Sequence, residues 1–274
     1  MMNHMVYYFT GTGNSLLIAK ELALLTKAKL LPVTATVGDA TVSAEVIGVV
    51  FPIYMYNAPH IVYEFIQKIE RCDYFYIVMT MGGESGNTSR KITTKIASRG
   101  FHLKAAFSLV MPSNYIPWNG AIPDEKQDAT TNDARMRLPE IAAIVNDRRE
   151  HRDDERNIIV NHNYPVPFLF RYPPLGVRQY FADMGFNFIR KMDGAFMTNE
   201  KCNGCGTCVR ICPVHNVTLS HERPVWHHRC EQCFGCLQWC PREAVEYGRK
   251  SRSRRRYHHR EIPVSDMVAQ AEGR

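Results

Sequence analysis

The sequence has no long apolar run, and its beginning has none of the features of a secretion signal. No stretch of the 274 residues approaches the ~20 consecutive apolar residues that a membrane-spanning helix needs. Residues 1–9 contain neither a basic segment nor a small-residue cleavage site, so a signal peptide is not indicated. We therefore expect a cytoplasmic protein without membrane insertion. With 45% hydrophobic and 22% charged residues, the chain can bury a core.

Cysteine is sparse over most of the chain and crowded in one part of it. Of nine cysteines, eight lie between Cys202 and Cys240. A reducing compartment keeps thiols free of disulfides, so this crowding indicates metal ligation. The remaining Cys72 precedes an expected strand and is interpreted as a packing residue.

Two copies of one pattern account for the eight cysteines. Each copy has three cysteines at intervals of three residues and then a Cys-Pro pair, at 202–213 and 230–241. Three such thiolates can bind three corners of a [4Fe–4S] cube, and in two-cluster ferredoxins the fourth cysteine of each run binds the other cluster. The first cluster is therefore assigned to Cys202, Cys205, Cys208 and Cys240, and the second to Cys230, Cys233, Cys236 and Cys212. Zinc also binds Cys-x-x-Cys pairs, but it has no use for a third cysteine and Cys-Pro in both runs.

Residues 2–112 alternate between strand and helix patterns. Near-continuous apolar runs at 6–9, 46–51, 74–79 and 106–111 are typical of parallel strands that are covered on both faces. Apolar residues recur at helical spacing over 16–25, over 61–69 and at Ile92 and Ile96, after which Gly100 ends the helix. This order predicts an α/β fold with a doubly wound parallel sheet.

The segment from 113 to 194 has a weaker pattern. Pro139 is a suitable first residue for a helix that continues through Val145. Residues 161–174 include four prolines and are expected to form an extended connector. Apolar residues then recur at helical spacing and are interpreted as a packed helix between two domains: Val177, Phe181, Met184 and Phe188.

The first expected strand is followed by a loop that can hold a phosphate. The loop consists of Thr10, Gly11, Thr12, Gly13, Asn14 and Ser15. Its glycines allow close approach of the backbone, and the helix that follows offers free N–H groups. A nucleoside-triphosphate loop needs a Gly-Lys-Ser/Thr ending, which is missing, and a dinucleotide fingerprint needs a glycine where Leu16 stands. A hydroxyl-rich loop without lysine fits the monophosphate of FMN.

On these motifs the chain resembles two known families. Residues 2–112 resemble a flavodoxin, residues 196–247 resemble a bacterial two-cluster ferredoxin, and their order resembles the EFR-type flavodoxin–ferredoxin fusions of anaerobes. The resemblance implies the flavodoxin strand order, with FMN beyond the carboxyl ends of the strands, followed by an α+β ferredoxin domain. The expected division is a flavodoxin-like domain at 1–155, a linker with an inter-domain helix at 156–194, a ferredoxin domain at 195–248 and a basic tail at 249–274.

The resemblance also implies which residues bind the flavin. The phosphate would be held by Thr10, Thr12, Gly13, Asn14 and Ser15. One face of the ring would be covered by Pro52, Ile53, Tyr54, Met55, Tyr56 and Asn57, and its edge would meet Met81, Gly82, Gly83 and the residues up to Gly86. Residues 52–59 lack the usual glycine, although Asn57 tolerates a positive φ better than most residues do. The segment 111–118 would cover the ring or contact the ferredoxin domain, with a plain linker as the alternative.

Three functions fit this combination of motifs. The first is a redox adaptor that passes single electrons between two [4Fe–4S] clusters, FMN and a redox partner protein. The second is an FMN-dependent reductase of a small molecule such as a quinone or nitro compound, although no acid–base constellation stands out. The third uses the basic tail, in which seven of the twelve residues from 249 to 260 are Lys or Arg. Such a tail can meet nucleic acid or an acidic partner, or it can fold back on the protein's own acidic surface. Nucleic acid is the weakest of these partners because the chain lacks a reading helix.

Overall fold

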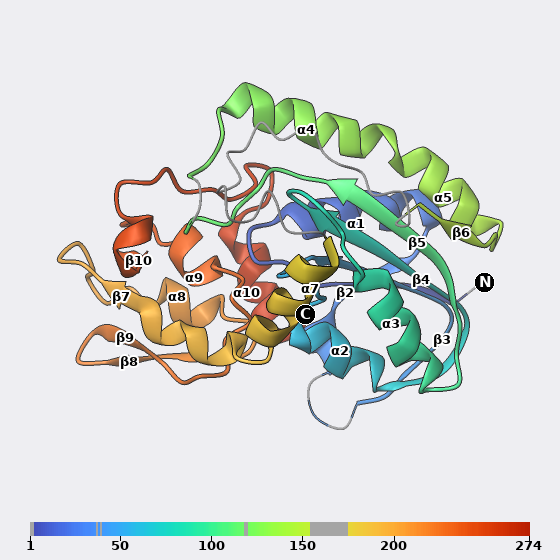
Figure 1. Ribbon diagram of the computed structural model, residues 1–274, viewed down its shortest axis with the longest axis horizontal. Helices are drawn as coiled ribbons and strands as arrows, with labels where there is room; N and C mark the ends of the chain where they lie inside the picture. The colour runs from blue at the N-terminus through green and yellow to red at the C-terminus, as the bar shows by residue number, and fades with distance from the viewer. Residues whose placement is uncertain (1–2, 37, 39, 118–119, 154–174) are drawn as a thin grey trace.

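The computed structural model covers all 274 residues and describes them except for 1–2, 37, 39, 118–119 and 154–174. Its N-terminal part is a six-stranded parallel sheet in the order β2-β1-β3-β4-β5-β6, with helices on both faces (Figure 1). The first five strands follow the order 2-1-3-4-5, which is that of the flavodoxin-like doubly wound fold. The fold predicted from the sequence is confirmed.

The sheet and its helices occupy most of the first 152 residues. The strands are β1 (His4–Tyr8), β2 (Lys29–Pro32), β3 (Val42–Pro52), β4 (Ile69–Met81), β5 (Leu103–Val110) and β6 (His151–Arg152). The helices are α1 (Asn14–Thr26), the 3-10 turn η1 (Val33–Thr36), α2 (His60–Ile66), α3 (Thr88–Ala97), α4 (Asp124–Met136) and α5 (Leu138–Asn146).

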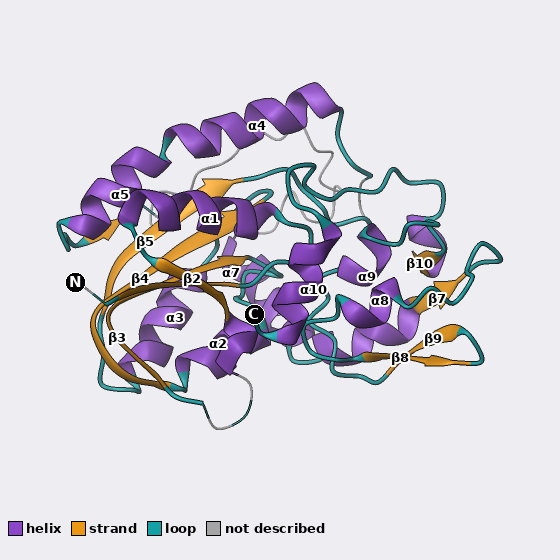
Figure 2. Ribbon diagram, turned by 180° about the vertical axis from the view of Figure 1, so that it is seen from behind, coloured by secondary structure: helices purple, strands orange, loops and turns teal. Residues whose placement is uncertain are grey.

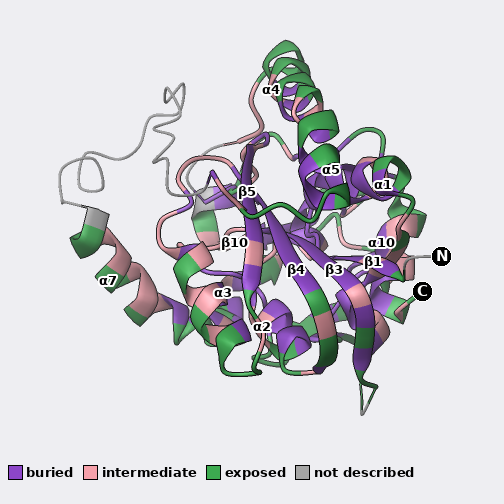
Figure 3. Ribbon diagram, turned by 90° about the vertical axis from the view of Figure 1, so that its right-hand side faces the viewer, coloured by how far each residue is buried: buried purple, intermediate pink, exposed green. Residues whose placement is uncertain are grey.

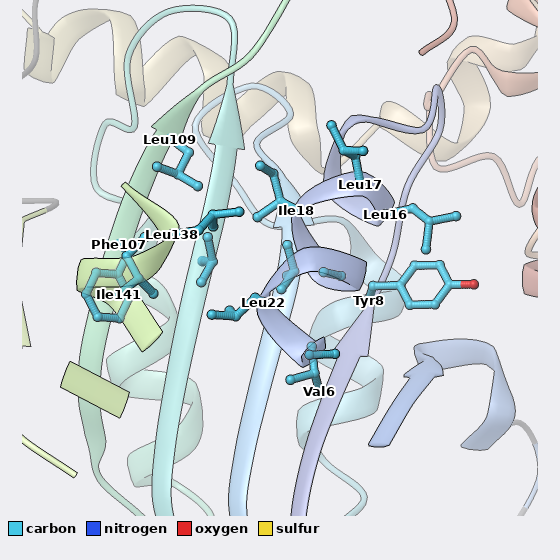
Figure 4. Close-up of a cluster of buried hydrophobic side chains, with 14 of the residues drawn as sticks. Val6, Tyr8, Leu16, Leu17, Ile18, Leu22, Phe107, Leu109, Leu138 and Ile141 are labelled. Carbon is cyan, nitrogen blue, oxygen red and sulfur yellow. The ribbon is translucent and has the colours of Figure 1, made fainter. Parts of the chain in front are cut away.

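Both faces of the sheet are buried because its strands carry apolar side chains in both directions. One face packs against α1 and α5 through a cluster of buried residues that includes Val6, Leu22 and Ile141, which are labelled in Figure 4. The other face packs against α2 and α3 through residues such as Ile47 and Phe65. Because the strands are parallel, the loops that follow β1, β3 and β4 lie at the same end of the sheet, beyond the carboxyl ends of the strands. A doubly wound fold binds its ligand there.

Some elements differ from the sequence expectations. Ile69, which was assigned to a helix, begins β4 because α2 already ends at Ile66. Strand β2 and helix α4 were not expected, since β2 is short and largely not buried, and α4 consists mainly of polar residues. The helix predicted from Pro139 is confirmed as α5. The connector expected at 161–174 lies outside the described residues.

The cysteine-rich part is a small α+β unit that lies beyond one end of the sheet (Figure 2). It consists of β7 (Phe196–Thr198), α8 (Thr207–Arg210), β8 (Val217–Ser220), β9 (Arg223–Trp226), α9 (Gly235–Gln238) and β10 (Val245–Tyr247). Strand β7 pairs with β10 and β8 pairs with β9, both antiparallel. Each cysteine run leads into one of the two short helices, so the duplicated sequence pattern is also a duplicated structure.

The basic segment from 249 to 274 is folded back onto the rest of the chain. It forms the 3-10 turn η3 (Gly248–Ser251) and the terminal helix α10 (Val264–Glu272). Its arginines pair with acidic residues of the same chain, namely Arg252 with Glu246, Arg255 with Asp124 and Arg260 with Asp128. This arrangement agrees with the expectation of a segment that covers the protein's own acidic surface.

Helix α7 (Leu175–Phe186) has the predicted helical spacing but not the predicted packing. The apolar stripe of this helix and the residues just after it is 43–62% exposed, at Val177, Phe181, Met184 and Phe188 (Figure 3). The helix is attached by its other side, where Phe186 stacks on His60 with ring centroids 4.3 Å apart. Asp183 forms an ion pair with Lys91 of α3. The interpretation of the stripe as a packed face was wrong, because polar contacts fasten this helix. The 3-10 helix η2 (Ile189–Ala195) then leads into β7.

Candidate functional site

Four of the predicted cluster ligands line one cavity in the cysteine-rich unit. We call this group the cluster 1 site: Cys202, Cys205, Cys208 and Cys240. Cys240 comes from the second run, so the cavity joins the two runs in the crossed manner that the sequence predicts. Burial raises the pKa of the Cys208 thiol to about 11, and the thiolates of Cys240, Cys205 and Cys202 act in the same direction. The four sulfur atoms are therefore close enough to interact electrostatically.

The other four cysteines of the two runs form a second group. We call it the cluster 2 site: Cys212, Cys230, Cys233 and Cys236. The pKa of Cys230 lies well above its usual value, first because of burial and then because of Cys233, Cys236 and Cys212. Burial likewise raises the pKa of Cys233 to about 12. Cys212 comes from the first run, which completes the exchange of the fourth cysteines.

Backbone N–H groups point at sulfur atoms in both sites. The N–H of Asn216 donates to Cys212 Sγ (3.2 Å), that of Ala244 to Cys240 Sγ (3.3 Å) and that of Gln232 to Cys230 Sγ (3.2 Å). A hydrogen bond to sulfur is stronger when the sulfur is a thiolate, so these donors favour the form that binds iron. Within the described residues, no three His, Cys, Asp or Glu side chains converge on the position of a single metal ion. A [4Fe–4S] cluster instead binds four thiolates at its four separate iron corners. Each of the two sets of four thiols therefore has the number of ligands that one such cluster needs.

The cysteine runs curl around their sites through residues with left-handed backbone. Gly204 (φ 70°) and Gly206 (φ 71°) do this in the first run, and Gln232 (φ 53°) and Phe234 (φ 57°) occupy the same positions of the second. A left-handed residue other than glycine costs about 1–2 kcal/mol. Burial of the Phe234 ring against Phe196 and other aromatic side chains offsets that cost. The sequence pattern shows the duplicated cysteines but does not reveal this strained copy of the turn.

The predicted phosphate loop lies between the end of β1 and the start of α1. Gly13 has a φ of 97°, which glycine adopts without strain, and its N–H donates to Thr10 Oγ1 (3.0 Å). The Ser15 and Thr80 hydroxyls are hydrogen-bonded at 2.8 Å, which ties the loop to the end of β4. Helix α1 has no side-chain cap, so no capping side chain competes for its first N–H groups. These are the groups that an anion at a helix N-terminus uses.

Two residues near the end of the chain, which the sequence did not indicate, form hydrogen bonds with the backbone of the phosphate loop. The side-chain amide of Gln270 in α10 accepts a hydrogen bond from Thr10 N (2.8 Å) and donates one to Thr10 O (2.9 Å). The N–H of His259 donates to Thr12 O (2.8 Å). These contacts join the two ends of the chain, and no local sequence pattern could have indicated them.

The cysteine-rich unit also contacts this loop. Trp239 Nε1 donates to Gly11 O (3.0 Å). Asn114, in the segment after β5, donates to Thr12 Oγ1 (2.6 Å), and its carbonyl accepts a hydrogen bond from Gln238 (2.9 Å). The segment expected at 111–118 therefore contacts the cysteine-rich unit, which was one of its expected roles; its last residue lies outside the described residues.

The loop predicted to cover the flavin ring forms a tight turn with two left-handed residues. Tyr54 and Asn57 exchange backbone hydrogen bonds of 2.9 Å around Met55 (φ 50°) and Tyr56 (φ 56°). The positive φ that Asn57 would tolerate is thus found at the two preceding residues. Asn57 instead holds the turn by donating from its side chain to Met55 O (2.9 Å). Lys91 donates to the Tyr56 carbonyl (3.1 Å) and further restrains it.

The two ring loops face each other and are in contact. The Tyr56 ring lies against Gly86, where an added Cβ would stand 2.6 Å from Tyr56 Cδ1. The Tyr56 hydroxyl donates to Glu84 (3.1 Å), and Glu84 pairs with Arg178 of α7 (3.0 Å). Burial raises the pKa of Tyr56 to about 12, and the Glu84 carboxylate contributes to the increase. A flavin ring bound between these loops would have to displace the Tyr56 side chain from Gly86.

The hydroxyl of Tyr54 tests whether a phosphorylated cofactor fits this edge of the sheet. It is buried without a hydrogen-bond partner, and it lies 3.0 Å from the position of a Cβ on Gly11. An unsatisfied buried hydroxyl costs about 1–3 kcal/mol. Cys233 O occupies the space between this hydroxyl and Gly11, because it lies 2.4 Å from the same Cβ position. The hydroxyls of Thr12 and Ser15 are hydrogen-bonded to Asn114 and Thr80, so the first N–H groups of the uncapped helix are the donors left for a phosphate monoester. The N-terminus of α1 therefore fits the phosphate end of FMN.

Comparisons with known proteins address the two units separately. Residues 197–218, which contain the first cysteine run, match the family described as 4Fe-4S binding domain. The chain is similar to the structure of a flavodoxin, WrbA-like protein from Agrobacterium tumefaciens, with 15% identity and a TM-score of 0.35 over 54% of this chain and 100% of that one. It is also similar to an azoreductase from Bacillus anthracis, with 10% identity and a TM-score of 0.36 over 53% and 100%. These two similarities carry no conclusion. A comparison with curated proteins gave no match.

The chain joins a flavodoxin-like sheet to a ferredoxin-type 4Fe-4S motif. Because an iron–sulfur cluster is a one-electron centre, the chain belongs to the class of redox proteins that transfer electrons. In the part of the chain that the structure describes, no helix is both long and apolar enough to cross a membrane.

Proposed function

We propose that this protein passes single electrons between two [4Fe–4S] clusters, FMN and a redox partner protein. The observation that carries the proposal is the shared cavity of the cluster 1 site, in which Cys240 joins three cysteines that precede it by more than thirty residues. Crossed ligation of this kind belongs to proteins that hold two clusters close together. Close clusters serve sequential one-electron transfer.

Each cofactor supplies a different part of the chemistry. The clusters exchange one electron each, and the flavin accepts either one or two, which lets it pair electrons that arrive singly. The cluster 1 and cluster 2 sites would hold the clusters, and the loop from Thr10 to Ser15 would hold the FMN phosphate. The ring would lie at the loops that follow β3 and β4.

The chain's own residues bind and shield these groups. N–H donors to Cys212, Cys230 and Cys240 stabilise anionic sulfur and thereby influence the cluster potentials. The first N–H groups of α1 would hydrogen-bond the FMN phosphate, and the positive end of the helix dipole would favour its negative charge. Helix α7 excludes water from the ring loops, where Arg178 and Glu84 are both mostly buried. A protein with so many free thiols also suits the reducing cytoplasm, which we propose as its location.

An FMN-dependent reductase needs open access to the flavin ring. In this structure α7 is fastened beside the ring loops by two ion pairs, Arg178 with Glu84 of the second ring loop and Asp183 with Lys91 of α3. This arrangement supports the electron-transfer protein over the reductase. Steady-state turnover with a quinone panel separates the two, since saturable turnover well above that of free FMN would support the reductase.

Anaerobic purification with iron, sulfide and flavin analysis tests the proposal. We expect about eight irons and about one FMN per chain. The variant Cys240→Ala should lower the iron content toward about four, because it removes the crossed ligand of one cluster. Cys72→Ala is the matched control, since Cys72 belongs to neither site, and it should leave the iron content unchanged. Zinc in place of iron, or full iron content in Cys240→Ala, would contradict the proposal.

A further inference from the structure

The two cluster sites are placed very differently relative to the predicted flavin site. The ligand loop of the cluster 2 site lies directly on the phosphate loop. An added Cβ on Gly11 would stand 2.8 Å from Cys233 Cβ, and one on Gly235 would stand 3.2 Å from Gly11 O. Glycine at position 11 is therefore required for this close approach, and Gly235 adds a second tight contact from the other unit.

Further contacts fix the cluster 2 loop to the flavodoxin-like sheet. Cys233 packs into the apolar cluster of that sheet, as Tyr54 does. Glu231, which is 2% exposed, accepts a hydrogen bond from His60 N (2.7 Å) at the start of α2. Arg190 lies 3.7 Å from the same carboxylate. The loop that carries Cys230 and Cys233 is thus held in place on the side that faces the predicted flavin loops.

The cluster 1 site lies on the opposite side of the cysteine-rich unit. Its first run packs against the β8–β9 hairpin, where an added Cβ on Gly204 would stand 2.9 Å from Glu222 Cβ and one on Gly206 would stand 3.8 Å from Leu219 Cδ1. Cys205 is exposed, and Leu219 at the cavity wall is 42% exposed. Figures 1 and 2 both show β8 and β9 at the end of the molecule that is farthest from the sheet.

Electron tunnelling slows steeply with distance, so each transfer uses the nearest pair of centres. We propose that the cluster 2 site is the relay to the flavin and that the cluster 1 site is the port at which an external one-electron carrier protein docks, over Cys205 and Leu219. This inference rests on the proposed function. Each docking event oxidises the carrier by one electron and reduces the cluster at the port. That electron moves on to the second cluster and the flavin, and two such events with two protons from solvent reduce one flavin completely.

The port accommodates a small and transient contact. Leu219 and Pro224 provide apolar surface at the wall of the cavity, and Arg242 adds a positive charge there. Contacts between electron carriers are at the small end of protein interfaces, so one substitution at their centre has a large effect. An acidic carrier protein suits this mixture of apolar surface and a cation.

Leu219→Glu tests the port in the protein that carries its cofactors. Reduced plant-type ferredoxin, an acidic protein, serves as the protein donor, and dithionite serves as the small donor. We expect Leu219→Glu to slow reduction by ferredoxin about tenfold or more, which corresponds to about 1.4 kcal/mol of lost docking, and to slow reduction by the small dithionite ion far less. Leu24→Glu is the matched control, because Leu24 is 80% exposed on α1, and it should alter neither rate. If Leu219→Glu and Leu24→Glu slowed reduction by ferredoxin equally, or if neither slowed it, the proposed docking port would be overturned.

Cys205→Ala tests the order of the two clusters. If the cluster 2 site is the relay, this variant loses reduction by ferredoxin but still passes electrons from dithionite through its remaining cluster to the flavin. Slow flavin reduction after the remaining cluster has been reduced would instead place the cluster 1 site next to the flavin and overturn the order. A wild-type protein without FMN or with fewer than about eight irons would refute the proposed function itself. A fully loaded protein with an unaffected Leu219→Glu variant would refute only the port.

Discussion

Gln270 offers a direct measure of how far the end of the chain supports the phosphate loop. Its side chain is 0% exposed and forms two hydrogen bonds with the backbone of Thr10, which is itself 1% exposed. Gln270→Met keeps a side chain of similar length but removes both partners. The N–H and the carbonyl of Thr10 are then buried without a hydrogen bond.

The expected loss follows from these two groups. An unsatisfied buried backbone group costs about 1–3 kcal/mol, and the helix around Gln270 allows little relaxation. We therefore expect Gln270→Met to lower the free energy of unfolding by about 2–4 kcal/mol. About half of this free energy can be recovered if the loop leaves its binding conformation and the Thr10 backbone groups find other partners. The affinity for FMN then falls about tenfold.

Two assays and one control separate loss of stability from loss of binding. Denaturant unfolding gives the change in stability, and quenching of FMN fluorescence on titration of the flavin-free protein gives the dissociation constant. Gln127→Met is the control, because Gln127 is also buried and hydrogen-bonded but lies in α4. It should lower stability and leave the FMN dissociation constant unchanged. The reasoning fails if Gln270→Met binds FMN as tightly as the wild type, or if both variants lose the same affinity.

Two further substitutions test the packing between the units and the buried histidine. Gly11→Ala places a methyl group against Cys233, whose backbone cannot move without disturbing a ligand loop, so we expect a cost of about 1–3 kcal/mol and faster hydrogen exchange across 230–236. Gly194→Ala, where an added Cβ meets nothing within 4 Å, should show neither effect. Burial lowers the pKa of His4, which is hydrogen-bonded to Tyr76 (3.1 Å), from 6.5 to about 4. Because the folded pKa is the lower one, the stability from neutral His4 is complete above pH ~6.5 and is lost as the pH falls toward 4. Between about pH 7.5 and 5.5 the wild type should lose about 1.4 kcal/mol more unfolding free energy than His4→Gln, and equal losses would refute this cause.

The sequence by itself determined the fold class and the two cofactor motifs, because both depend on local patterns. Strands covered on both faces must be apolar in both directions, so β3 and β4 were visible as continuous runs. The spacing of the eight cysteines is set by the geometry of the loops around each site, and the spacing can be read directly. The phosphate loop was visible for the same reason, since its glycines and hydroxyls are consecutive from Thr10 to Ser15.

Patterns on the surface were less informative. The stripe from Val177 to Phe188 has the spacing of a packed helix face, yet it is exposed, because ion pairs on the other side of α7 decide how the helix attaches. The polar helix α4 was missed because its residues bury little apolar area. The left-handed residues at Met55 and Tyr56 were also missed, since neither residue type favours that conformation and only the surrounding contacts hold it.

Only the tertiary structure decided how the two units face each other and what the end of the chain does. The contact of Gly11 with Cys233 and that of Thr10 with Gln270 join residues more than 200 positions apart, and such pairs leave no trace in a local pattern. Gly11, which the sequence pattern assigns to a phosphate loop, also leaves the space into which the cluster 2 ligand loop packs. A segment that reads as a basic tail supplies the hydrogen bonds behind that loop, because the backbone groups of a buried loop must find partners wherever the fold provides them.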